Sequence, residues 1–167
     1  MASKTVAGKR YLENAKVFIK NGFRVIGVDA SRTLLKEAKK LVPRGIFLNK
    51  DLRKIRFPRH TFDGIWANAV LLHISRAEMP KVLRNLYRML KPSGILHVLV
   101  KEGKGEAYVK EVLSENRQRF FTYFSKPGLE KLIRAAGFKI IYSTFAADEL
   151  GRRNVRWIVV WGKKIAK

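Results

Sequence analysis

An aspartate at the end of a predicted strand is the clearest candidate for binding chemistry in this sequence. Asp29 closes a β-branched run within the stretch FRVIGVDAS, residues 23–31. In an open α/β sheet, ligands bind at the carboxyl ends of strands, and a carboxylate there can accept two hydrogen bonds from a ribose. Asp29 can equally help to start the next helix, where Ser31 is placed as a cap. The stretch alone leaves both interpretations open.

A second group of side chains could hold phosphates. A charged loop from Leu52 to Phe62 surrounds Pro58 with cations, and such a segment can bind a polyanion. An aromatic run, residues 120–124, could stack bases or could fill the core, which is the more usual place for large rings. The basic candidates for nucleic-acid binding are Lys9, Arg10, Arg53, Lys54, Arg56, Arg59, Arg117, Arg119, Arg152 and Arg153.

The composition argues against several other kinds of functional site. The chain has no cysteine, which excludes disulfides, thiolate metal ligands and a cysteine nucleophile. Its histidines, His60, His73 and His97, lack the spacing of metal ligands, so we expect no metal. No apolar run reaches the roughly 18 residues of a membrane span. The sequence therefore predicts a soluble, cytoplasmic protein without a membrane partner.

The charge balance is the most informative bulk property. The 167 residues hold 36 Lys and Arg against 13 Asp and Glu, a formal net charge of +23. That excess attracts polyanions, and nucleic acid is the usual polyanion in a cell. No helix-turn-helix or basic recognition helix stands out, so RNA or a ribonucleoprotein is favoured over DNA.

The elements that position these residues follow from periodicity. Helical stripes are expected over 11–21, 31–42, 79–90 and 125–136, and apolar strands over 23–29, 46–48, 64–68, 95–100, 138–145 and 155–161. Alternating strands and helices predict parallel pairing with right-handed crossovers. The last two strands are separated by a short loop, so they pair antiparallel. The length suits a single α/β domain over residues 1–167.

Laid out in this order, the chain resembles the class I S-adenosylmethionine-dependent methyltransferases, which have a Rossmann-like fold. VIGVDAS resembles the second-strand motif of that family, NKDL the motif after its third strand, FDGIWANAVLLHI its fourth-strand motif and LKPSGILHVLV its fifth strand. The resemblance covers about residues 15–162 and implies a mostly parallel sheet with an antiparallel C-terminal hairpin. It implies S-adenosylmethionine as the cofactor, with Asp29 and its neighbour Ala30 at the ribose, Asp51 and its neighbour Leu52 near the adenine, and Ala67 and Asn68 beside the methionine part.

The motif that departs from the family is the glycine-rich turn after the first strand. By spacing, that strand and turn fall on KTVAGKRYL, where Gly8 matches the first glycine and Val6 stands in place of the expected acid. Side chains from Lys9 to Leu12 occupy the remaining turn positions, although the turn needs φ > 0 and close backbone approach. A short first strand over residues 3–7 is still expected to pair, because its two neighbours would otherwise lose their shared partner.

Two functions follow from these observations. One is a methyltransferase-fold protein that binds RNA or a ribonucleoprotein through its basic surface, with a degenerate cofactor site. The other is an active methyltransferase acting on RNA, because methyl transfer needs mainly proximity and alignment of donor and acceptor. A nicotinamide-dependent dehydrogenase is remote, since no GxGxxG follows the first strand.

Overall fold

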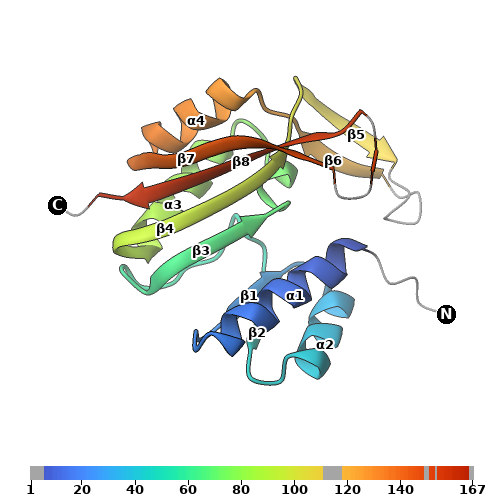
Figure 1. Ribbon diagram of the computed structural model, residues 1–167, viewed down its shortest axis with the longest axis vertical. Helices are drawn as coiled ribbons and strands as arrows, with labels where there is room; N and C mark the ends of the chain where they lie inside the picture. The colour runs from blue at the N-terminus through green and yellow to red at the C-terminus, as the bar shows by residue number, and fades with distance from the viewer. Residues whose placement is uncertain (1–5, 111–117, 149–150, 153, 166–167) are drawn as a thin grey trace. The chain divides into compact units, whose positions relative to one another are not determined.

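A computed structural model describes residues 6–110, 118–148, 151–152 and 154–165, with side chains from Leu12 onward. The chain divides into two compact units, residues 1–55 with 110–117 and residues 56–109 with 118–167. Each unit carries one part of the predicted sheet. Figure 1 labels the helices and strands by which the units are described here.

The first unit holds two helices and two parallel strands. Helix α1 (Val6–Lys20) precedes β1 (Ile26–Asp29), and α2 (Arg32–Leu41) precedes β2 (Ile46–Asn49). The two strands pair in parallel register, Ile26 with Ile46 through to Asp29 with Asn49, which confirms the predicted crossover unit. The core of the unit is formed by apolar side chains from both helices and β2: Leu12, Ala15, Leu35, Ala38, Val42 and Phe47.

The expectation of a first strand over residues 3–7 is wrong for its described part. Val6 and Ala7 belong to α1, which also contains Gly8 and the positions expected to form the cofactor turn. Residues 1–5 lie outside the description. A helix is physically reasonable here, because VAGKRYLENAK contains good helix formers and no proline. The turn that the resemblance placed at Gly8–Leu12 is therefore not formed.

The second unit is built on a four-stranded sheet of order β3-β4-β8-β7. Strand β3 (Phe62–Asn68) pairs parallel with β4 (Leu90–Lys101), and β8 (Arg156–Lys164) pairs antiparallel with both β4 and β7 (Phe138–Ala147). The predicted antiparallel C-terminal hairpin is confirmed.

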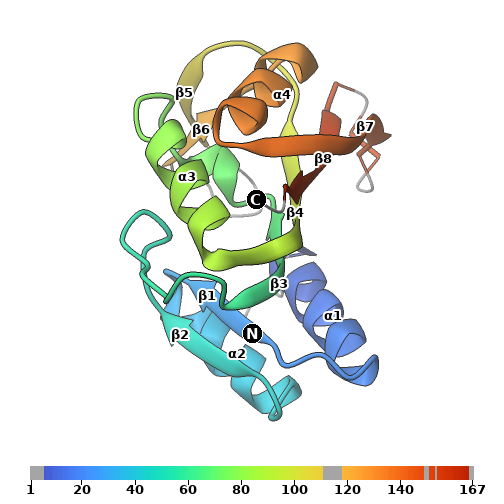
Figure 2. The same ribbon diagram turned by 90° about the vertical axis from the view of Figure 1, so that its left-hand side faces the viewer.

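Helices α3 (Met79–Met89) and α4 (Lys126–Ala135) cover one side of this sheet, as Figures 1 and 2 show. The predicted apolar stripe of α3 is buried, and so are Val98 of β4 and Val160 of β8, both fully inaccessible. Ser125 caps α4 by accepting a hydrogen bond from the Gly128 N–H, and Gly137 follows that helix with φ +104°. The sequence signals for this layer are therefore confirmed.

The charged segment after β4 contains two further strands. Strands β5 (Glu106–Lys110) and β6 (Gln118–Thr122) form a separate two-stranded sheet, and residues 111–117 between them lie outside the description. Of the aromatic run, Phe121 and Phe124 are 2% and 1% exposed. These two rings fill the core and are not available to stack bases. A short 3₁₀ turn, η1 (Leu71–His73), precedes α3.

Candidate functional site

The ribose candidate lies in the first unit, at the carboxyl end of β1. The Asp29 Oδ1 accepts a hydrogen bond of 2.7 Å from the Ser31 N–H, and the Ser31 Oγ in turn accepts one from the Leu34 N–H that opens α2. Asp29 therefore does shape the turn into α2, one of the two interpretations that the sequence allowed. A carboxylate offers about four lone-pair sites, and the bond from Ser31 occupies one of them.

Asn49 holds the ends of β1 and β2 together. Its side-chain amide Nδ2 donates to the carbonyl oxygens of Asp29 at 3.1 Å and of Ala30 at 2.8 Å, while its Oδ1 accepts from the Arg32 Nε at 3.3 Å. The sequence predicts a cofactor-binding role for Asp51 but none for Asn49. The signal available was an Asn directly at the carboxyl end of a predicted parallel strand.

The adenine candidate Asp51 is engaged by a neighbouring arginine. Arg53 bonds its carboxylate in a bidentate manner, with Nη2 to Oδ2 at 2.6 Å and Nε to Oδ1 at 3.0 Å, and the Arg53 N–H donates to Oδ1 as well. The Arg53 side chain thereby lowers the pKa of Asp51 below its usual value. Leu52 between them is half-buried. Arg53, a candidate for phosphate contact, forms an ion pair with Asp51, and its contact with phosphate stays a prediction.

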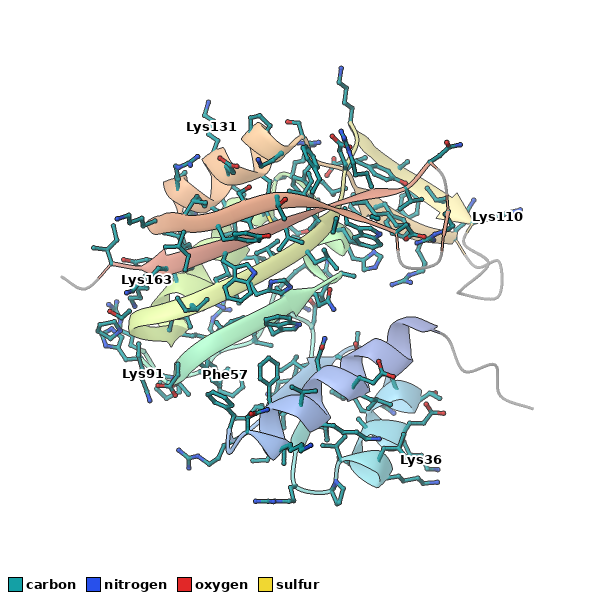
Figure 3. The ribbon with its side chains drawn as sticks, in the orientation of Figure 1. Lys36, Phe57, Lys91, Lys110, Lys131 and Lys163 are labelled. Carbon is teal, nitrogen blue, oxygen red and sulfur yellow. The ribbon has the colours of Figure 1, made fainter. Side chains whose placement is uncertain are left out.

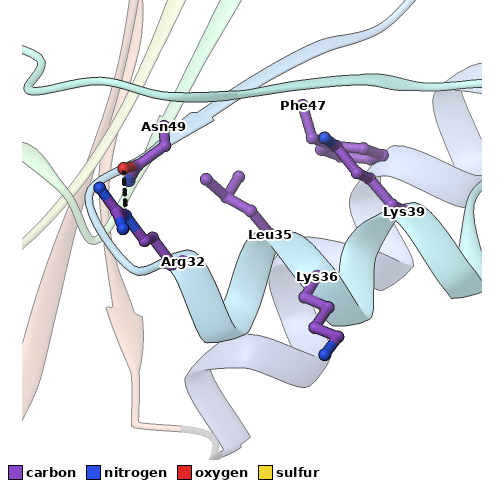
Figure 4. A pocket seen from close by; sticks show the side chains of 6 residues that line it. All are labelled: Arg32, Leu35, Lys36, Lys39, Phe47 and Asn49. Carbon is purple, nitrogen blue, oxygen red and sulfur yellow. Dashed lines mark hydrogen bonds between the residues drawn. The ribbon is translucent and has the colours of Figure 1, made fainter.

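A pocket of about 430 Å³ lies beside α2 in the same unit. Figure 4 shows the side chains that line it: Arg32, Leu35, Lys36, Lys39, Phe47 and Asn49. Neither Asp29 nor Asp51 contributes to this lining. Three of the six lining residues are basic, so the pocket is basic. The two candidate carboxylates for cofactor binding lie outside it.

The methionine-end candidates belong to the second unit, at the carboxyl end of β3. Ala67 is buried, and the Oδ1 of Asn68 is also buried with no hydrogen-bond partner in the described part of the chain. Ala69 follows with φ +53°, an uncommon conformation for a residue other than glycine. An unsatisfied buried carbonyl oxygen costs free energy. Asn68 is therefore suited to accept a hydrogen bond from a bound ammonium group.

His73 and Arg119 form a pair that the sequence did not suggest. Arg119 Nη2 donates to His73 Nε2 at 2.6 Å, and His73 Nδ1 lies 2.7 Å from the carbonyl oxygen of Phe120. Because arginine has only donors, Nε2 must be the acceptor, and the ring proton sits on Nδ1, where it is donated to Phe120. The pairing depends on how β6 lies against η1, for which the sequence carries no signal.

The remaining basic candidates are divided. Arg152 binds Asp148, with Nη2 to Oδ1 at 2.8 Å, and this bond holds the pKa of the buried Asp148 well below its usual range. Arg152 thus forms a local ion pair, and its contact with phosphate stays a prediction. Lys54, Arg56 and Arg59 are exposed. Lys9 and Arg10 lie in α1, whereas Arg117 and Arg153 fall outside the described residues.

The described ranges contain no group of three or more His, Asp or Glu side chains that could hold a metal ion. No helix among them is long and apolar enough to cross a membrane.

Curated methyltransferases share part of this sequence. Phosphoethanolamine N-methyltransferase of Plasmodium falciparum is 26% identical over 137 residues, which is 77% of this chain and 50% of that protein. Trans-aconitate 2-methyltransferase of Enterobacter sp. is 34% identical over 83 residues, which is 50% of this chain and 32% of that protein. The chain thus spans at most half the length of these curated relatives.

Solved methyltransferases share the fold. A methyltransferase of Methanosarcina mazei superposes with a TM-score of 0.78 at 16% identity over 93% of this chain and 87% of its own. The 1,6-didemethyltoxoflavin-N1-methyltransferase of Burkholderia thailandensis, solved with S-adenosylhomocysteine, gives 0.74 at 19% identity over 98% of this chain and 80% of its own. A family profile described as a methyltransferase domain matches residues 8–98. This chain therefore belongs to the methyltransferase domain family and has the α/β fold of the class I S-adenosylmethionine-dependent enzymes.

Proposed function

We propose that this chain binds S-adenosylmethionine and acts as a methyltransferase domain. The observation that carries the proposal is the pair of carboxylates at the carboxyl ends of two paired parallel strands, Asp29 as the last residue of β1 and Asp51 just beyond β2. Asp29 would accept bonds from the ribose hydroxyls, and Asp51 from the adenine amino group. Asn49 supports this role because its amide Nδ2 donates to the carbonyl oxygens of Asp29 and Ala30 and ties the end of β2 to the end of β1.

The amino-acid end of the cofactor would lack part of the family's site. The glycine turn of the family is replaced here by helix α1. Without that turn, backbone N–H groups are not presented to the carboxylate. We therefore expect cofactor binding that is weaker than that of an enzyme with the complete turn.

Methyl transfer requires few catalytic groups from the protein. S-adenosylmethionine supplies an activated methyl group for in-line displacement, so alignment of the acceptor is the main requirement. Within the first unit, Asp29 and Asp51 would hold the donor. The names of the curated relatives denote phosphoethanolamine and trans-aconitate as acceptors, which supports methyl transfer as the reaction class.

Replacing the ribose carboxylate tests the proposal directly. We expect Asp29→Ala to weaken S-adenosylmethionine binding about tenfold, because the ribose hydroxyls lose their acceptor. Isothermal titration calorimetry with purified, nucleic-acid-free protein measures this. The wild-type chain must first show binding; no heat at millimolar cofactor would refute the proposal.

Asp29→Asn is the matched control for the local turn. The asparagine oxygen can still accept from the Ser31 N–H, but the side chain loses its charge and half of its acceptor capacity. We expect an affinity between those of the wild type and Asp29→Ala. Equal affinity for all three proteins would mean that Asp29 only shapes the turn into α2.

RNA binding is a second candidate function, favoured by the net charge of +23. Exposed cations occur in both units, and Figure 3 labels Lys36 on α2 and Lys163 on β8 among them. The chain has only 13 Asp and Glu, too few to neutralise its 36 Lys and Arg. A polyanionic partner would relieve this self-repulsion.

Salt dependence is the sharpest test of this second candidate. Phosphate contacts release counterions, so RNA affinity is expected to fall at least about tenfold between roughly 50 and 200 mM salt. Fluorescence anisotropy with a labelled single-stranded RNA measures the slope. If affinity does not change over this range, the basic surface is not an RNA-binding surface.

A further inference from the structure

A row of rings crosses the sheet of the second unit on the side away from α3 and α4. The strand register places Trp66 next to His97, His97 next to Trp161, and Trp161 next to Tyr142. Successive ring centroids are 3.7, 5.9 and 6.2 Å apart, with Trp66 stacked on His97. These four residues are called the aromatic row below.

The position of Gly162 shows on which face of the sheet the aromatic row lies. A Cβ on Gly162 would lie 3.2 Å from Ile133 Cγ2, so position 162 faces α4. Side chains alternate along a strand, and Trp161 therefore points to the opposite side. Trp66, Trp161 and Tyr142 are 42%, 37% and 52% exposed, which is unusual for large rings arranged side by side on a sheet.

Two lysines stand beside the row on the same face. Lys139 of β7 is the register partner of Lys163 of β8, and both are exposed. Like charges directly opposite each other destabilise a strand pair. The paired segments of the four strands, residues 64–68, 95–101, 139–146 and 157–163, contain no Asp or Glu. This face therefore combines exposed rings with uncompensated positive charge.

We propose that this face binds single-stranded RNA, with bases stacked on the exposed rings of the aromatic row and phosphates beside Lys139 and Lys163. The proposal rests on the RNA-binding candidate and names its surface. Bases of any RNA sequence can stack on aromatic side chains, and adjacent lysines can bind the phosphates of the RNA backbone. His97 is buried beneath Trp66 and supports the row from within.

Charge distinguishes this occupant from a second copy of the chain. Two copies packed through this face would bring four lysines together, two from each, without a carboxylate from the paired segments. An apolar contact would then have to overcome like-charge repulsion. A polyanion with aromatic bases complements both features of the face at once.

The first experiment measures binding of a labelled oligouridylate of about 12 nucleotides, a length within the usual site size. Tyr142→Ala removes an exposed ring of the row, and we expect it to weaken binding at least about fivefold. Tyr108→Ala is the matched control, because Tyr108 is a 70% exposed tyrosine on β5. It is expected to bind RNA as the wild type does.

A charge-matched pair of variants separates this face from general attraction. Lys139→Glu with Lys163→Glu and Lys81→Glu with Lys131→Glu change the net charge equally, but the second pair lies on α3 and α4 (Figure 3 labels Lys131 and Lys163). We expect the first pair to bind at least about tenfold more weakly than the second. Photo-crosslinking with 4-thiouridine RNA should label peptides that contain Trp66 or Trp161.

The outcomes separate the face from the broader candidate. If the wild type binds RNA but Tyr142→Ala equals Tyr108→Ala and the two lysine pairs are alike, the face is not the site, and RNA binding lies elsewhere. If the wild type does not bind RNA at low salt, the RNA-binding candidate itself fails. A dimer in sedimentation that Tyr142→Ala dissociates, without an effect on RNA, would assign the face to a second copy.

Discussion

Between pH 6.5 and pH 4 we expect the second unit to lose up to about 3 kcal/mol of unfolding free energy through His97 alone. The ring is 7% exposed, and burial lowers the pKa of His97 from 6.5 to about 4. In the unfolded chain the same side chain titrates near 6.5. Protons therefore bind the unfolded state first, and stability falls as the pH drops through this window and levels off below about 4.

Urea unfolding at pH 7 and at pH 4.5 measures the effect. The three tryptophans report on this unit, because Trp66, Trp157 and Trp161 all belong to it. His97→Phe keeps a ring between Trp66 and Trp161 but cannot be protonated. We expect the variant to lose much less stability than the wild type over the same interval, and equal losses would contradict the assignment.

The acidic groups do not obscure this comparison. Hydrogen bonds from Arg152 and Trp157 hold the pKa of Asp148 below its usual value, and bonds from Ser143 and Arg134 lower that of Glu130. A carboxylate with a lowered pKa keeps its stabilising contribution until the pH falls below its unfolded value. These losses therefore begin where the His97 effect is ending.

Local signals in the sequence were sufficient for most elements. Ser31 and Ser125 mark helix starts because their hydroxyls accept from the first-turn N–H groups, and both bonds are present. The apolar stripe of α3 follows the 3.6-residue period and is buried. Parallel pairing of β1 with β2 followed from one intervening helix. These features depend only on neighbours within a few residues.

Features that depend on long-range pairing were beyond the sequence. The aromatic row exists because the strand register aligns Trp66, His97, Trp161 and Tyr142. The paired residues are up to 64 positions apart in the sequence, and no local pattern specifies which residues pair. The first strand failed for the opposite reason: it was inferred from resemblance, while the local propensity of residues 6–12 favours a helix.

A count of basic residues does not show which of them have an acidic partner nearby. Arg53 and Arg152, both candidates for phosphate contact, each lie within four residues of an acid that they bind, Asp51 and Asp148. That spacing was visible in the sequence and predicts a local ion pair. Exposed lysines without such a neighbour, as at Lys163, are the better candidates for a polyanion.

Lys164 is expected to contribute strongly to stability although its neighbour Lys163 does not. The two residues point to opposite sides of β8, and Lys164 is 7% exposed. Its Nζ donates hydrogen bonds of 2.8 Å to the carbonyl oxygens of Tyr87 and Leu90, at the end of α3, and lies 4.6 Å from the centre of the Tyr87 ring. Burial lowers the pKa of Lys164, and these bonds compensate part of the cost of its charge.

Lys164→Met keeps most of the stem and removes the ammonium group. We expect it to reduce the unfolding free energy by about 2 to 3 kcal/mol, because two carbonyl oxygens at the end of α3 lose their donor. Lys163→Met, on the exposed face, should change it by less than about 0.5 kcal/mol. Urea unfolding at pH 7, followed by tryptophan fluorescence, compares them. If the two variants are equally stable, Lys164 does not anchor α3 to β8, and the packing of that helix depends on its apolar stripe alone.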